Sequence, residues 1–175
     1  MSLLRPFSKL PGLNTANILV SLFSLIKLTD FTLETPRLAK SLPLPVENEE
    51  TRPRIDLVVF IIHLSSELSL QSAEASLKYL DPGYFLGKVC FMVTNARSAS
   101  VPTERLDAAR KLAASLQCPL LFAEDQTPNG VSSATEKLLN ILKVAAGHVP
   151  MATALYLSNL TRCTLPPDIA QPSFD

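Results

Sequence analysis

The stretch that decides the fold runs from Arg52 to Asn95 and reads RPRIDLVVFIIHLSSELSLQSAEASLKYLDPGYFLGKVCFMVTN. Ile55 to Leu64 is almost unbroken apolar sequence rich in β-branched residues, which predicts a strand buried on both faces of a parallel sheet. Ser69 to Leu80 then has apolar residues at helical spacing, and Lys88 to Thr94 is a second buried strand. Strand, helix and strand in this order predict a parallel pair joined by a crossover helix. Because folds of this class bind ligands at the carboxyl ends of their strands, function is first sought there.

The same alternation continues outside this stretch. Asn17 to Leu22 and Pro119 to Ala123 are short apolar runs typical of strands. Pro102 begins a further helical pattern, and Ser133 with Glu136 forms a capping box that predicts the start of another helix. The chain therefore belongs to the α/β class.

Length and composition fit one globular domain. The 175 residues are 47% hydrophobic and 18% charged, which is enough to bury a proper core. We predict a domain over residues 1–164 and a polar, proline-rich, disordered tail over 165–175. Sixteen basic residues balance sixteen acidic ones, so net charge gives no reason to bind nucleic acid or an anionic membrane. The apolar run Ile18 to Leu28 is too short to span a bilayer.

Residues that could carry chemistry are few and scattered. Cys90, Cys118 and Cys163 lack paired spacing, which favours reduced thiols over disulfides or zinc ligands. His63 and His148 have no cysteine, histidine or aspartate cluster beside them, so a hydrogen-bonded structural role is favoured for His63 over catalysis or metal binding. The sequence predicts no catalytic residue, no metal site and no cofactor.

Asp56 interrupts an apolar strand. It could be a remnant acid of an active site, but an edge position, or a pair with Arg52 or Arg54, explains it better.

The order of elements resembles a Ras-like small GTPase. Val58 to Ala96 is similar to the fourth strand, third helix and fifth strand of that family. The resemblance implies a three-layer fold with a mostly parallel sheet.

The nucleotide-binding elements of that family are missing. A phosphate loop needs G-x-x-x-x-G-K-[ST], but Ser21 to Lys27 contains no glycine, and no Asp-x-x-Gly follows to hold magnesium. Asn95 matches the first position of the base-reading Asn-Lys-x-Asp motif, whereas Ala96 and Ser98 occupy the lysine and aspartate positions. A degenerate GTPase that still binds nucleotide and acts as a switch is the alternative, and these losses argue against it.

Several separate strings are similar to one family, centromere protein M. They are LRPFSKLPGLNTANIL (4–19), LAKSLPLP (38–45), RPRIDLVVF (52–60), YFLGKVCF (84–91) and AGHVP (146–150). The resemblance implies a pseudo-GTPase without nucleotide, in the constitutive centromere-associated network of the inner kinetochore. Its implied role is non-catalytic: it stabilises the helical-repeat centromere protein I, together with centromere proteins H and K, and so supports kinetochore assembly and chromosome segregation. The implied location is the nucleus, at the centromere and kinetochore of the chromosome.

One region departs from that family. Ser21 to Arg37, after the first strand, is shorter than its counterpart and differently composed. We expect this segment to be the part of the domain least protected from hydrogen exchange, in contrast to Ile55 to Leu64.

Two apolar segments are candidate protein-contact surfaces. The loop between the first helix and the strand that follows carries Tyr84 and Leu86, and the segment after the last long helix carries Met151, Leu155 and Tyr156. Exposed aromatic and aliphatic residues of this type serve as interface anchors. For Leu155 a place in the core explains the sequence equally well.

Overall fold

The computed structural model describes residues 4, 16, 18–21, 42, 54–96, 98, 101–123 and 127–149. Its elements are, in chain order, β1 (Ile18–Ser21), β2 (Leu57–His63), α1 (Glu67–Leu77), the 3-10 helix η2 (Pro82–Phe85), β3 (Val89–Thr94), α2 (Thr103–Ser115), β4 (Leu120–Ala123) and α3 (Pro128–Ala145).

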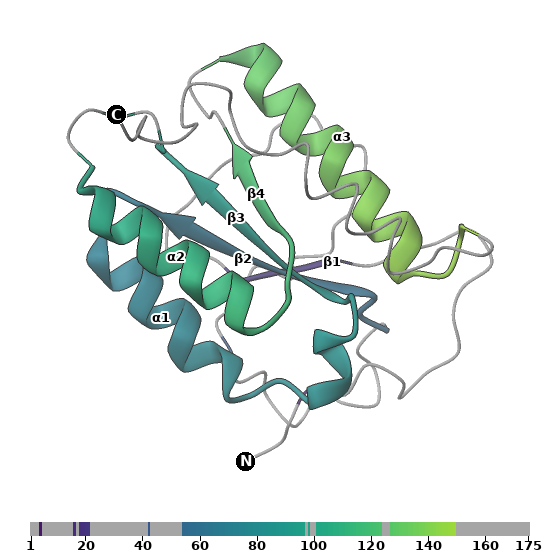
Figure 1. Cartoon of the computed structure of the whole chain (residues 1–175). Coiled ribbons are helices and arrows are strands. Elements are labelled where there is room, and N and C mark those ends of the chain that lie inside the picture. Colours follow the sequence, from purple (N-terminus) through teal and green to yellow (C-terminus); the bar gives the residue numbers. More distant parts are fainter. Residues whose placement is uncertain are drawn as a thin grey trace, which may run out of the picture.

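The strands form one sheet in the order β1-β2-β3-β4, and each neighbouring pair is parallel. Helices α1 and α2 cover one face of the sheet and α3 covers the other, so the described part of the chain has three layers (Figure 1). The predicted α/β class with a parallel sheet is thereby confirmed, as is the strand–helix–strand unit at its centre.

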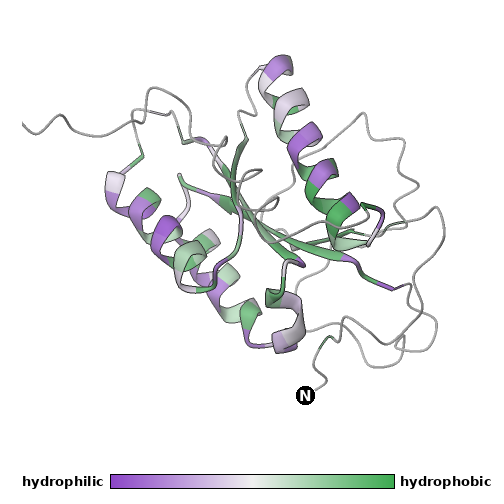
Figure 2. Ribbon diagram, turned by 45° about the vertical axis from the view of Figure 1, so that its right-hand side comes forward, coloured by the Kyte–Doolittle hydropathy of each residue, from purple (hydrophilic) through white to green (hydrophobic). Residues whose placement is uncertain are grey.

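The core lies on both faces of β2 and β3, because successive side chains of a strand point to opposite faces. On the α1/α2 face, Val58, Phe60 and Ile62 belong to one buried cluster, while their neighbours in β2 belong to a second cluster beneath α3. The rings of Phe60 and Phe91 stack with centroids 5.6 Å apart. Figure 2 shows the apolar strands between helices that carry polar residues on their outer sides.

The start of α3 differs from the prediction. The helix begins at Pro128, and the Thr127 hydroxyl accepts a hydrogen bond from the Gly130 N–H at 3.1 Å. Thr127 is therefore the cap, with proline at the first helical position where its missing N–H costs nothing. Ser133 and Glu136 are exposed residues of the helix rather than its capping box.

Other predicted features lie outside the described residues. These are the tail over 165–175, residues 22–37 of the altered segment, Cys163, and the contact candidates Met151, Leu155 and Tyr156. In the part of the chain that is described, no helix combines the length and apolarity needed to cross a membrane.

Candidate functional site

The carboxyl edge of the sheet brings three polar residues together. His63 ends β2, Thr94 ends β3, and Asn95 follows with a φ of 59°. The Thr94 hydroxyl lies 2.6 Å from His63 Nδ1, and Asn95 Nδ2 lies 3.0 Å from His63 Nε2. Thr94 and Asn95 thus each bond to one of the two ring nitrogens of His63, and the direction of each bond follows from the tautomer of the ring. Both ring nitrogens are occupied, which confirms the hydrogen-bonded structural role expected for His63.

Two further side chains form hydrogen bonds at this edge, which is called closed because its polar side chains are bonded within the domain. The Ser69 hydroxyl accepts from the His63 N–H at 2.9 Å and donates to the Ile61 carbonyl at 3.4 Å, which ties α1 to β2. Arg105, at the start of α2, donates to the carbonyls of Leu64 and Ser65, each at 3.1 Å. The edge where a small GTPase would hold its nucleotide is thus joined by internal hydrogen bonds between β2, β3 and both helices of one face.

Over the described ranges, no three histidine, cysteine, aspartate or glutamate side chains gather to hold a metal ion, and no buried side-chain nitrogen or oxygen lacks a hydrogen-bond partner.

Burial raises the pKa of the Cys118 thiol to about 12, and burial together with the neighbouring Cys118 raises the pKa of Cys90 above its ordinary value. Neither thiol is therefore a ready nucleophile at neutral pH.

The amino edge of the sheet carries the more unusual surface. Leu86, between η2 and β3, is 81% exposed. Its neighbour Phe85 is half-buried against the main core cluster. Leu86 is therefore a large apolar side chain that the domain itself does not cover, as the sequence analysis expected of this segment.

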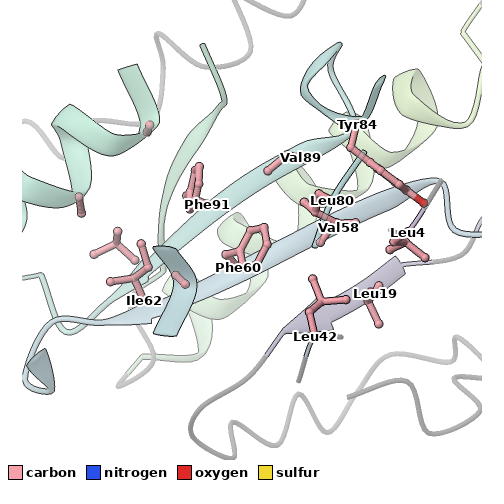
Figure 3. Close-up of a cluster of buried hydrophobic side chains, with 14 of the residues drawn as sticks. Leu4, Leu19, Leu42, Val58, Phe60, Ile62, Leu80, Tyr84, Val89 and Phe91 are labelled. Carbon is pink, nitrogen blue, oxygen red and sulfur yellow. The ribbon is translucent and has the colours of Figure 1, made fainter. Parts of the chain in front are cut away.

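Tyr84 was expected beside Leu86 on the surface, and that prediction is wrong. Its side chain is 0% exposed, and its hydroxyl donates to the Ile55 carbonyl at 3.3 Å. Figure 3 shows the ring among Leu4, Leu80 and Val89. The physical reason is the 3-10 turn: with three residues per turn, η2 directs Tyr84 inward, and a buried tyrosine is stable once its hydroxyl has an acceptor.

The turn that carries Leu86 is held at several points. Leu4 pairs with the chain after α1, donating from its N–H to the Tyr79 carbonyl and accepting from the Asp81 N–H, each at 2.9 Å. The Asp81 carboxylate accepts from the Gly83 N–H at 2.8 Å and caps η2. Gly87, with a φ of 84°, lets the chain reverse directly after Leu86, a conformation that costs other residues more. Leu86 therefore projects from a fixed backbone.

Buried charges lie behind this turn. Arg54 Nε and Asp56 Oδ1 form an ion pair at 2.7 Å just before β2, which confirms the predicted pairing of Asp56. The Lys88 amine donates to the Ala145 carbonyl in the last turn of α3. Burial and the positive charge of Arg54 lower the pKa of Lys88, and the negative charge of Asp56 opposes them. This contact could not be predicted from the sequence, because Lys88 and Ala145 are far apart in the chain.

Comparison with known proteins identifies the same family that the separate strings of the sequence resemble. The profile of the family Centromere protein M (CENP-M) matches residues 1–164. The chain belongs to the centromere protein M family. Among its relatives, centromere protein M of Danio rerio is 55% identical over 183 residues, with 98% of each chain covered. The Homo sapiens protein is 41% identical over 179 residues, covering 97% of this chain and 98% of its own, and the Xenopus laevis protein is 40% identical over 178 residues, covering 96% and 99%.

The range that the centromere protein M profile matches includes the residues of both edges, which lie within 54–96 and 101–123. Sequence reasoning had named Leu86, His63 and Asn95. It missed Leu68 at the start of α1, which is 65% exposed, and the depth of Lys88, which is 8% exposed. Leu68 lies between Glu67 and Ser69, and Lys88 directly precedes the apolar run of β3, and neither position fixes which way a side chain points.

Proposed function

We propose that this chain is a non-catalytic interaction subunit of the inner kinetochore, with a small-GTPase-like fold that binds no nucleotide. It acts in the nucleus at the centromere of the chromosome, where it stabilises a helical-repeat partner and so supports kinetochore assembly and chromosome segregation. The proposed partner is centromere protein I, in company with centromere proteins H and K. Membership in a centromere protein family supports the setting, and the parallel sheet with helices on both faces is the scaffold that a small-GTPase-like fold requires.

The observation that carries the proposal is the exposure of Leu86 on a fixed turn. A leucine 81% exposed leaves its apolar surface in water, where it gains nothing for the fold. Burial of that surface against a partner would instead contribute its hydrophobic free energy to binding. Because hydrogen bonds through Leu4, Asp81 and Tyr84 already hold the turn, little conformational entropy is lost on contact.

The closed carboxyl edge supports the absence of nucleotide chemistry. Thr94 and Asn95 each bond to a ring nitrogen of His63, so a guanine base would have to break one of these hydrogen bonds to pair with either side chain. With no phosphate-loop glycines after β1, the chain also lacks the backbone N–H cradle that phosphates need.

The test of the interface is Leu86→Asp. A central apolar anchor typically contributes at least ~2 kcal/mol, and a buried carboxylate adds a desolvation cost, so binding to centromere protein I should weaken by about 30-fold or more. The companion variant Leu155→Glu tests the second predicted segment. The measurement is co-elution of the purified proteins in size-exclusion chromatography, with a titration by calorimetry.

Leu68→Asp is the matched control. Leu68 is 65% exposed but lies on α1 beside the carboxyl edge, so the same change there should leave both folding and binding as they are. Undiminished binding by Leu86→Asp, or equal loss by Leu68→Asp, contradicts an interface at the amino edge. A circular-dichroism melt of each variant separates lost binding from lost folding.

The test of the nucleotide proposal is direct. The purified protein should contain no GTP or GDP, should show no hydrolysis, and should give no heat on titration with either nucleotide and magnesium. Micromolar binding in that titration supports the rival interpretation, a switch with degenerate motifs.

A further inference from the structure

Thr127 is an exposed residue directly before α3, and Pro128 follows it. Its backbone is extended, with a φ of −125° and a ψ of 135°. Among all serines and threonines of the sequence, only Thr35 and Thr127 precede a proline. Proline-directed protein kinases select a hydroxyl in that position, and proline keeps the residue before it out of the helical conformation. Thr127 therefore combines an accessible hydroxyl, the recognition residue and the backbone shape that such a kinase requires.

The first turn of α3 is held by few interactions. It contains Asn129 and Gly130, which are poor helix formers. The hydroxyl of Thr127 accepts from the Gly130 N–H and its carbonyl accepts from the Val131 N–H, each at 3.1 Å. From residue 129 onward, the first buried side chain is that of Ala134. The turn can therefore open and offer Thr127 to a kinase as extended chain without exposing the core.

We propose that Thr127 is a phosphorylation site for a proline-directed protein kinase. In that reaction the Thr127 hydroxyl oxygen forms a bond to the γ-phosphorus of ATP, and the bond from this phosphorus to the bridging oxygen breaks, so that ADP leaves. The hydroxyl proton passes to the catalytic base of the kinase. The inference stands on residues 127–134 alone and does not depend on the proposed function at the amino edge.

A phosphate on Thr127 strengthens the start of α3. The first N–H groups of a helix have no partners within its regular ladder, and the helix dipole places partial positive charge there. A phosphate on the cap residue brings negative charge and strong acceptor oxygens to these groups. Once phosphorylated, the first turn should therefore open less often, by about fivefold. Modification of Thr127 thus acts on the order of the helix that covers one face of the sheet (Figure 1).

The experiment treats the full chain with a purified mitogen-activated protein kinase, which is proline-directed, in the presence of ATP and magnesium. Intact mass measures the phosphate gained, and peptide fragmentation assigns its position. Thr127 should be modified in the original chain and equally in Thr35→Ala, which removes the other Thr-Pro pair. Thr127→Ala should gain no phosphate at the start of α3. Pro128→Ala keeps the acceptor but removes the recognition residue, so modification of Thr127 should slow by about tenfold or more.

Amide exchange then compares the phosphorylated chain with the unmodified one. The amides of Gly130 and Val131 should exchange about fivefold more slowly after phosphorylation. The amides of Leu116 and Cys118, which close α2, are the internal reference and should not change. A chain that gains no phosphate on Thr127, or that is modified there equally fast as Pro128→Ala, overturns the site. Unchanged or faster exchange at Gly130 and Val131 in the phosphorylated chain overturns the effect on α3.

Discussion

The two edges of the sheet differ in where their polar and apolar side chains lie. At the carboxyl edge, His63, Thr94 and Asn95 satisfy one another, and Arg105 and Ser69 bond to the backbone beside them. At the amino edge the charges of Asp56 and Lys88 are buried and that of Arg54 is partly buried, whereas an apolar side chain, Leu86, is exposed. Parallel α/β domains commonly place ligands at the first edge. The comparison teaches that fold class alone does not decide which edge is joined by internal hydrogen bonds and which carries an exposed apolar side chain; the residues at each edge decide it.

The largest effect is expected from the buried charges of the amino edge. Asp56→Ala removes the partner of Arg54 and leaves positive charge beside the buried Lys88, so the free energy of unfolding should fall by about 3–5 kcal/mol. Urea denaturation at pH 7 measures the change.

Asp107→Ala is the control for Asp56→Ala. Asp107 pairs with Arg110 at 3.5 Å on the exposed side of α2, with 58% of its side chain accessible. Loss of such a surface pair should cost no more than about 1 kcal/mol. If the two variants unfold at similar urea concentrations, the amino edge is not held by its buried charges and the contrast between the edges weakens.

A smaller effect is expected at the carboxyl edge. His63→Ala removes the hydrogen bonds to Thr94 and Asn95, and the free energy of unfolding should fall by about 1–3 kcal/mol. Binding to the proposed partner, centromere protein I, should not change, because both ring nitrogens of His63 are bonded within the domain. Leu86→Asp should give the reverse pattern, with stability kept and binding lost. Weakened binding by a folded His63→Ala protein would move the functional surface to the carboxyl edge.

The centre of the fold could be predicted from the sequence because its pattern is simple. Ile55 to Leu64 and Lys88 to Thr94 are almost unbroken apolar runs with β-branched residues, and β2 and β3 occupy most of both. Few arrangements other than a doubly covered parallel sheet bury such runs. The pairing of Asp56 with Arg54 followed for a related reason, since a buried carboxylate needs a close partner.

The sequence predicts less well those features whose local pattern is compatible with two different structures. Pro128, Asn129 and Gly130 are typical of turns, so the start of α3 was placed at Ser133, although the same proline and Thr127 form a good helix start. Tyr84 and Leu86 look alike as apolar residues of one loop, yet one is 0% exposed and the other 81%. That distinction depends on the geometry of η2 and on an acceptor at Ile55, which lies 29 residues away in the chain.

The smallest predicted effect isolates one hydrogen bond of the carboxyl edge. Asn95 and Gln117 both have positive φ, 59° and 54°, which strains residues other than glycine. Gln117 is exposed, so Gln117→Gly should relieve that strain and raise the free energy of unfolding by up to ~1 kcal/mol. Asn95→Gly gains a similar relief but loses the bond to His63, so its stability should stay within about 0.5 kcal/mol of the original. The difference between the two variants, measured by thermal or urea unfolding, is the contribution of that bond. If Asn95→Gly is stabilised as much as Gln117→Gly, the Asn95 amide contributes nothing to closing the edge, and it is free to serve a ligand there instead.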